Sequence, residues 1–267
     1  MSSRRQVLGS ALAAGGALAV GTAGTAEATE RPAKRVTFVL VHGVFADASG
    51  WNAVAARLLD AGHQVIAPAN PLRDLAGDSA YVGSVVDTIT GPVVLVGHSY
   101  GGEVITNAGV GRANVKALVY VAAFAPDQGE SALQLAGQFP GSRLPEALVQ
   151  RPLPGGTDAD GYIDTARFHD VFAQDLPRST TRLMAVTQRP GSLGGLSNTS
   201  GVPAWRSVPS WYVVAGEDRV IPPVAQRFMA GRAGSRTVEV RGASHVVMMS
   251  RPEVVVRQLG AVCRSLV

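Results

Sequence analysis

The chain has 267 residues, of which 46% are apolar and 16% charged; this composition supplies a substantial core and excludes global disorder. Its single cysteine, Cys263, excludes an internal disulfide and cysteine-based zinc or iron–sulfur sites. The 24 basic and 20 acidic residues give a net charge of +4, and the basic residues are scattered and not interleaved with aromatics. The sequence therefore does not favour nucleic-acid binding.

Residues 1–28 differ in character from the rest of the chain and indicate an export signal. Ser3–Leu8 (SRRQVL) resembles the twin-arginine signature, a Gly/Ala-rich apolar stretch follows as far as Gly24, and Ala26–Ala28 (AEA) is typical of a signal-peptidase site. The alternative is an uncleaved anchor, but Gly and Ala contribute little transfer free energy to membrane insertion. We expect cleavage after Ala28, which gives a secreted domain of residues 29–267 without a stable membrane anchor.

Strand and helix patterns alternate from Val36 onward. Short apolar or β-branched runs predict strands at 36–41, 64–67, 93–96, 115–121, 210–215 and 237–240. Amphipathic stretches between them predict helices near 51–61, 78–90, 101–110, 223–230 and 252–266. This alternation predicts an α/β fold, with a mostly parallel sheet of about six strands and helices on both faces.

The alternation stops between about residues 126 and 203. This stretch is rich in Gly, Pro and Gln, shows no strand pattern, and has helical patches near 165–175 and 178–188. A segment of this length is too long for one loop of a compact domain. We therefore expect an inserted helical cap.

A nucleophile candidate lies in Gly97–Gly101 (GHSYG), which matches G-x-S-x-G. The motif alone is weak, but here it follows an apolar strand directly and opens a helix, which is the context that a nucleophile elbow requires. A serine held at positive φ between a strand and a helix needs neighbours without a Cβ atom, because the two elements approach closely. Ser99 is therefore the predicted nucleophile.

A serine hydroxyl needs a general base, and the chain has five histidines. His42 and His63 fall in turns, His169 falls in the predicted cap, and the side chain of His98 should point away from the cleft. His245 follows the last predicted strand, so it reaches the same sheet edge as the nucleophile. We expect His245 to be the base.

The acid that orients the histidine should lie near the end of another strand. Asp218 follows the strand at 210–215 and precedes His245 by 27 residues, which gives the chain order Ser99, Asp218, His245. Asp127 after the fourth strand is the alternative. Glu217 is a weaker candidate, since adjacent loop side chains rarely face the same way.

An oxyanion hole requires two converging N–H groups. The Tyr100 amide lies at the start of the helix after the nucleophile, and the Val44 amide, with the Phe45 amide as a fallback, follows the first strand. Several aromatic side chains are expected to line the substrate pocket, with packing in the core or cap as the alternative: Phe45, Tyr100, Phe124, Phe168, Phe172 and Trp205.

Four segments together resemble the α/β-hydrolase superfamily. They are Leu40–Trp51 (LVHGVFADASGW), Val93–Gly102 (VVLVGHSYGG), Gly216–Pro222 (GEDRVIP) and Gly242–Pro252 (GASHVVMMSRP). More narrowly, they are similar to the branch of methyl-salicylate-type esterases, hydroxynitrile lyases and their bacterial relatives. The resemblance covers about residues 36–265. It implies Ser99, Asp218 and His245 as a triad and Val44 and Tyr100 as oxyanion donors.

The same branch contains esterases and lyases, and two positions favour hydrolysis here. The lyases carry Thr where this chain has Gly43, and Lys directly after the catalytic histidine, where this chain has Val246. Neither Lys34 nor Lys116 lies in a motif. The resemblance therefore implies a serine esterase whose partner is a small apolar ester or lactone, with no cofactor and no metal. The alternatives are a lyase, perhydrolase or cofactor-free oxygenase on the same scaffold, or a non-catalytic ligand-binding protein.

Overall fold

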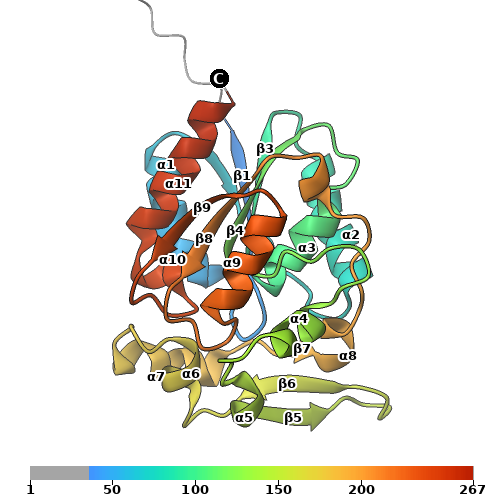
Figure 1. The fold of residues 1–267 in the computed structure, drawn as a ribbon, viewed down its shortest axis with the longest axis vertical. Coiled ribbons are helices and arrows are strands. Elements are labelled where there is room, and N and C mark those ends of the chain that lie inside the picture. Colours follow the sequence, from blue (N-terminus) through green and yellow to red (C-terminus); the bar gives the residue numbers. More distant parts are fainter. Residues whose placement is uncertain (1–35, 267) are drawn as a thin grey trace, which may run out of the picture. The chain divides into compact units, whose positions relative to one another are not determined.

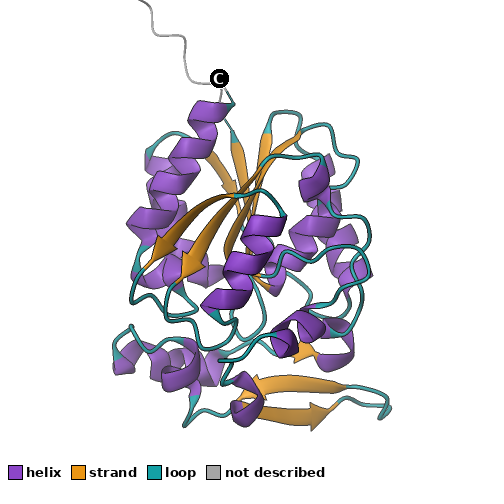
Figure 2. Cartoon of the chain, in the orientation of Figure 1, coloured by secondary structure: helices purple, strands orange, loops and turns teal. Residues whose placement is uncertain are grey.

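The computed structural model describes residues 36–266, and the predicted export signal lies outside them. Six parallel strands form the central sheet in the order β2-β1-β3-β4-β8-β9 (Figures 1 and 2). Their bounds are β1 Thr37–Val41, β2 Gln64–Ile66, β3 Val93–Ser99, β4 Val115–Ala123, β8 Ser210–Ala215 and β9 Arg236–Val240. The predicted α/β fold with a parallel sheet of about six strands is confirmed.

Burial explains why these strands have continuous apolar sequences. Strands β1, β3 and β8 are buried along their whole length, and β4 exposes Lys116 alone. Both faces of such strands pack against helices, so alternation with polar residues is lost. The two edge strands, β2 and β9, retain exposed positions.

Helices cover both faces of the sheet, with α1 and α11 on one face and α2, α3 and α9 on the other (Figure 1). The helices of the core are η1 Ala48–Trp51, α1 Asn52–Asp60, α2 Leu75–Asp87, α3 Tyr100–Ala108, α9 Pro223–Arg232, α10 Val247–Ser250 and α11 Pro252–Ser265. The α2 helix begins three residues before its predicted start. The reason is Asp74, whose carboxylate accepts the Gly77 N–H at 2.7 Å and caps the helix.

The insertion between β4 and β8, here called the cap, lies beyond the carboxyl ends of the strands (Figure 1). Its elements are α4 Ala132–Gln138, α5 Leu144–Ala147, β5 Leu148–Pro152, β6 Ala159–Ile163, α6 Phe168–Phe172, α7 Arg178–Thr187, β7 Gly191–Ser192 and α8 Leu193–Leu196. After the cap, η2 Ala204–Arg206 packs against α3 and leads into β8. The predicted helical patches correspond to α6 and α7.

The predicted cap contains helices, but it also contains an antiparallel sheet of β5, β6 and β7 that the sequence analysis did not expect. This sheet left little trace in the sequence. Strand β5 is mostly exposed and ends at Pro152, and β7 has two residues. In β6, Gly161 replaces the β-branched residue that a strand favours. A Cβ there would lie 2.8 Å from Leu193 Cδ2, so close packing of α8 requires the glycine. In residues 36–266 no helix has the length and apolarity needed to cross a membrane.

Candidate active site

Ser99 occupies the sharp turn between β3 and α3. Its backbone has φ 55° and ψ −126°, a left-handed conformation that non-glycine residues rarely adopt. A Cβ on Gly97 would lie 2.5 Å from Gly101 O, and one on Gly101 would lie 2.4 Å from Val41 O. Strand, turn and helix therefore pack so closely that both glycines are required, as the motif predicts.

The adjacent strand accommodates this turn. The β3–β4 ladder shifts register between His98 and Ser99, so that Ser99 pairs with Ala123, while Ala122 has φ 45°. The Ser99 carbonyl accepts the Phe124 N–H at 3.0 Å. Bulges and positive φ values gather at sites where a side chain must be aimed out of a sheet. Here they direct the end of β3 out of the regular ladder.

His245 and Asp218 form a buried pair. His245 Nδ1 lies 2.7 Å from Asp218 Oδ2, which also accepts Gln226 Nε2 at 2.8 Å. The other carboxylate oxygen, Oδ1, accepts the N–H groups of Val220 at 2.7 Å and Ile221 at 3.0 Å. These donors hold the carboxylate in place, and the carboxylate fixes the orientation of the imidazole. Gln226 on α9 is a residue that sequence reasoning missed, since a lone helical glutamine carries no motif.

His98 packs against the His245 ring and contacts the His245 backbone. Its Nε2 lies 3.0 Å from the His245 carbonyl oxygen, and the two ring centroids are 4.6 Å apart. Burial, and next the neighbouring His245, lower the pKa of His98 well below its ordinary value, so its ring is neutral and Nε2–H donates to the carbonyl. This placement agrees with the expectation that His98 points away from the cleft.

The second imidazole nitrogen of His245, Nε2, is the atom that must accept the serine proton. Among residues 36–266, His245 Nε2 has no hydrogen-bond partner although it is buried. Hydrogen bonds between base and nucleophile often tighten only when substrate is present. The arrangement thus offers an oriented, unoccupied proton acceptor at the sheet edge that carries Ser99.

The structure does not bring the alternative acids to His245. Asp127 binds Arg206 at 2.6 Å and accepts the Gln128 N–H at 2.7 Å. Glu217 is exposed, and its N–H donates to Ala243 O at 3.0 Å. Of the three candidates, Asp218 is the one that contacts the histidine.

The oxyanion hole was predicted to use one amide from the loop after β1, either Val44 or Phe45, and the amide of Tyr100. The Phe45 N–H donates to the Arg189 carbonyl of the cap at 2.8 Å, and Phe45 has φ 65°. Its amide is therefore engaged, which leaves Val44 N–H as the donor from this loop. Tyr100 is the first residue of α3, where an N–H has no acceptor within the helix.

The Tyr100 side chain is locked by a residue that sequence reasoning also missed. Its hydroxyl donates to Asp78 Oδ2 at 2.9 Å, and Asp78 Oδ1 accepts the Arg73 N–H at 3.2 Å. Asp78 is buried, and burial raises its pKa. Because Asp78 fixes the Tyr100 ring, it also helps to fix the backbone that carries the Tyr100 amide.

A small apolar cavity of about 60 Å³ adjoins Ser99. Its lining comes from the core and the cap: Val44, Phe45, Ser99, Tyr100, Phe124, Ala132, Leu133, Ala136, Leu144, Leu196 and Val220. The described residues that line it include no charged side chain. Phe45 and Phe124, two of the residues predicted to contact substrate, are part of this lining.

Trp205 is not brought to the cavity. Its indole N–H donates to Pro126 O at 3.0 Å at the base of the cap, and its ring lies near Arg206 and Arg232. Its position before β8 places Trp205 beside the start of the cap, which corresponds to the packing alternative given for it in the sequence analysis. Phe168 and Phe172 are buried in the cap, where Phe172 packs its edge against His245 with centroids 5.1 Å apart.

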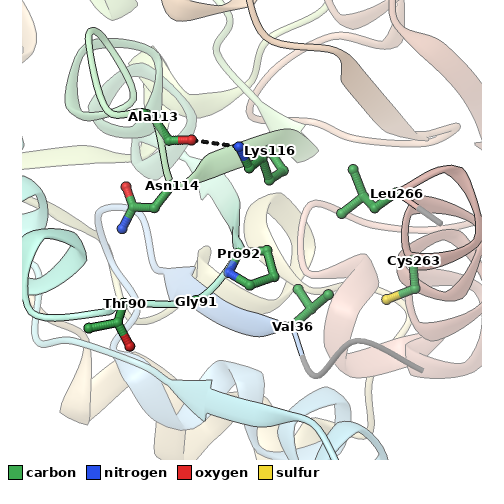
Figure 3. A pocket seen from close by; sticks show the side chains of 9 residues that line it. All are labelled: Val36, Thr90, Gly91, Pro92, Ala113, Asn114, Lys116, Cys263 and Leu266. Atoms are coloured by element: carbon green, nitrogen blue, oxygen red, sulfur yellow. Dashed lines mark hydrogen bonds between the residues drawn. The ribbon is translucent and has the colours of Figure 1, made fainter. Parts of the chain in front are cut away.

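A larger cavity of about 540 Å³ lies near the amino ends of strands β1, β3 and β4 (Figure 3). It is lined by residues before β1 and β3, by residues around the start of β4, and by the end of α11. Lys116 on its rim donates to Ala113 O at 2.7 Å. This cavity is remote from the carboxyl ends of the strands, so it does not take part in the chemistry of Ser99. Within residues 36–266, no group of three or more His, Cys, Asp or Glu side chains could hold a metal ion.

A model of the alpha/beta hydrolase family matches residues 38–258. The chain belongs to this family. It is 28% identical to Methylesterase 8 of Arabidopsis thaliana over 247 residues, covering 84% of this chain and 88% of that protein. It is 26% identical to an alpha-hydroxynitrile lyase of Arabidopsis thaliana, covering 84% and 96% of the two chains. The crystal structure of polyneuridine aldehyde esterase has the same fold, with a TM-score of 0.75, 24% identity and coverage of 86% and 99%. The predicted resemblance to a branch of esterases and hydroxynitrile lyases is confirmed.

Proposed function

We propose that this chain is a secreted serine esterase that cleaves small apolar carboxylic esters or lactones through an acyl-enzyme. The observation that carries the proposal is the buried Asp218–His245 pair. Among residues 36–266 its Nε2 has no hydrogen-bond partner, and the pair lies at the same end of the sheet as the strained Ser99. The relatives named as methylesterases support ester hydrolysis as the reaction.

The proposed reaction has two halves. Ser99 Oγ attacks the ester carbonyl carbon while His245 Nε2 takes its proton, and the Tyr100 and Val44 amides bind the resulting oxyanion. The intermediate then breaks its bond to the alcohol oxygen, and His245 returns the proton to the departing alcohol. Water repeats the sequence on the acyl-enzyme, which releases the carboxylic acid and restores Ser99.

The cavity beside Ser99 supports a short, uncharged acyl group. A volume of about 60 Å³ leaves little room beyond a few heavy atoms. Its apolar lining offers no partner for a charged group, and burying an unpaired charge there would be costly. Small apolar esters are therefore the substrates proposed.

The test is hydrolysis of p-nitrophenyl acetate by the wild type and by Ser99→Ala. We expect saturable, continued turnover by the wild type and a loss of at least about 10⁴-fold in kcat for the variant. Circular dichroism of the two proteins should be the same. A single burst equivalent without turnover would instead identify a ligand-binding protein, and turnover that survives in Ser99→Ala would reject this nucleophile.

Cyanohydrin cleavage is the second candidate because one relative is named alpha-hydroxynitrile lyase. Two residues disfavour it. Val246, at the position where the resemblance to the lyases implies a lysine, is fully buried and apolar. A Cβ on Gly43, where the resemblance implies a threonine, would lie 2.5 Å from Ser99 Cβ. Departing cyanide would thus have no cation beside it. The wild type should release no cyanide from mandelonitrile above background, and measurable release would reverse the assignment.

Secretion is proposed from residues 1–28 alone, which lie outside the described residues. The twin-arginine pattern and the AEA site predict a mature N-terminus at Thr29. N-terminal sequencing of protein from the culture medium tests this, with Arg4→Lys, Arg5→Lys expected to block export. An intact Met1 in the exported protein would contradict the proposal.

A further inference from the structure

One short segment of the cap contacts both loops that carry the His245–Asp218 pair. Gln174 Nε2 donates to the carbonyl oxygen of Glu217 at 2.7 Å, and Glu217 immediately precedes Asp218. Asp175 Oδ2 accepts the N–H of Ser244 at 3.0 Å, and Ser244 immediately precedes His245. Two neighbouring cap residues therefore hold the backbone directly before the acid and directly before the base.

The same segment also touches the imidazole. The Phe172 ring is fully buried, and its centroid lies 5.1 Å from that of His245 in an edge-on arrangement. The two loops are further joined to each other by the Glu217 N–H, which donates to Ala243 O at 3.0 Å. The cap thus packs against two connected loops. It contacts their backbone before Asp218 and before His245, and it contacts the His245 ring.

Two polar side chains of this segment are buried in a way that is unfavourable for stability. Among residues 36–266, Asp175 Oδ1 and Gln174 Oε1 are buried without a hydrogen-bond partner. A buried polar oxygen without a hydrogen-bond partner destabilises a fold, and more so when the group is charged. A chain optimised for packing alone would have apolar side chains at these positions.

We propose that Phe172, Gln174 and Asp175, here called the cap clamp, are positioning residues for the His245–Asp218 pair. Asp175 is the central member because its contact lies one residue from His245. Without it, the Ser244 N–H loses its acceptor and the loop that carries His245 is released on one side. A displacement of about 1 Å at a catalytic group can lower a rate by about 10²-fold. The kinetic part of this inference rests on the proposed esterase function.

The experiment compares Asp175→Ala, Asp175→Asn and the matched control Asp170→Ala with the wild type. Asparagine keeps an oxygen that can accept the Ser244 N–H, whereas alanine removes it. Asp170 is an exposed aspartate of the same cap region that binds Arg178 at 3.3 Å. Two quantities are measured for each protein: kcat and KM on p-nitrophenyl acetate, and the low-field proton NMR signal of His245 Nδ1–H, which reports its hydrogen bond to Asp218.

We expect Asp175→Ala to lower kcat by about 10–100-fold with KM changed less than about threefold. Its Nδ1–H signal should broaden at a temperature where the wild-type signal is sharp, because a loosened pair exchanges its proton with water faster. Asp175→Asn should restore most of kcat and the sharp signal. Asp170→Ala should match the wild type in both measurements.

Wild-type kcat and a sharp signal in Asp175→Ala would overturn the clamp, as would an equal loss in Asp170→Ala. If the wild type turns over no ester, the proposed function fails, while the NMR signal still decides whether the cap positions His245. If Asp175→Ala does not fold, Gln174→Ala provides the test: it frees the Glu217 carbonyl and should lower kcat by about 3–10-fold, a fraction of the effect above. An unchanged kcat and signal in that variant would also reject the clamp.

Discussion

The core and the cap hold the polar groups of the site in different ways. In the core, both carboxylate oxygens of Asp218 are fully engaged by His245, Gln226 and two backbone amides. In the cap, Gln174 and Asp175 each bind one loop, but each leaves one buried side-chain oxygen without a partner among residues 36–266. The core thus preorganises the acid–base pair, whereas the cap adjusts it from outside and forms much of the cavity wall.

The largest test of this difference concerns the acid. Asp218→Asn should lower kcat by about 10³–10⁴-fold, because an amide no longer holds the imidazole in the tautomer that leaves Nε2 free. The control is Asp127→Asn, which removes a carboxylate bound to Arg206 at the base of the cap and should change kcat little. Steady-state kinetics on p-nitrophenyl acetate measure both. The reverse order of effects would show that Asp127, after β4, is the acid and that the assignment of Asp218 is wrong.

The second test concerns the close packing of the core at Gly43. Its Cβ would lie 2.5 Å from Ser99 Cβ and 2.8 Å from His98 O, so Gly43→Ala must displace the loop that carries the Val44 amide. We expect kcat to fall by about 10²–10³-fold, the loss typical of one oxyanion donor. Gly231→Ala in α9 is the control, because a Cβ there meets nothing within 4 Å.

A wild-type kcat in Gly43→Ala would show that the loop can move without loss of the oxyanion site. The same contact bears on the lyase comparison, since threonine at this position would require the backbone near Ser99 to shift. Gly43→Thr with Val246→Lys should therefore lose esterase activity first. Cyanide release from mandelonitrile in that double variant would need such a shift to have occurred.

The contrast between core and cap also determines how much the sequence could predict. The core follows strong local rules: buried strands are continuous apolar runs, and Gly97 and Gly101 mark the turn at Ser99. Chain order then placed Asp218 and His245 at one sheet edge. Gln226 and Asp78 were missed because a single polar residue in a helix gains its meaning from a contact distant in sequence.

The cap follows weaker rules. Strand β5 is mostly exposed and ends at Pro152, and β6 contains Gly161, so both strands depart from the usual strand pattern. The close approach of Leu193 in α8 to Gly161 is a tertiary contact that the sequence pattern does not indicate. Trp205 illustrates the same limit, because an aromatic residue near a site in sequence can pack either over it or beside it. The clamp residue Asp175 likewise shows no motif, since its partner is a backbone amide 69 residues away.

Glu103 is a polar group of the core whose burial should make the stability of the fold depend on pH. It is fully buried in α3, and burial raises its pKa well above the ordinary value. The folded chain therefore keeps a proton that the unfolded chain loses above about pH 4.5. Stability is thus lost as pH rises from that value towards the folded pKa, by up to about 1.4 kcal/mol for each pH unit.

Glutamine cannot titrate, so Glu103→Gln should be stabilised relative to the wild type by more at pH 8 than at pH 5. Thermal unfolding followed by circular dichroism measures the difference at both pH values. Glu253→Gln, at an exposed position of α11, is the control and should show a smaller dependence. Equal shifts at both pH values for Glu103→Gln would mean that its carboxyl is not held protonated by the core.

The smallest expected effect concerns the cap's share of the cavity wall. Leu144 and Phe124 line the cavity from the cap and the core, whereas Trp205 does not line it. Leu144→Ala removes three carbon atoms from the wall, which makes room for a longer acyl chain. Each additional buried CH₂ contributes about 0.8 kcal/mol, or about fourfold in kcat/KM. The ratio of kcat/KM for p-nitrophenyl butyrate to that for the acetate should therefore rise by about 4–15-fold, and Trp205→Phe should leave it unchanged. If Trp205→Phe moves the ratio and Leu144→Ala does not, the acyl group binds at the base of the cap, and the division of labour between core and cap drawn above is wrong at the cavity.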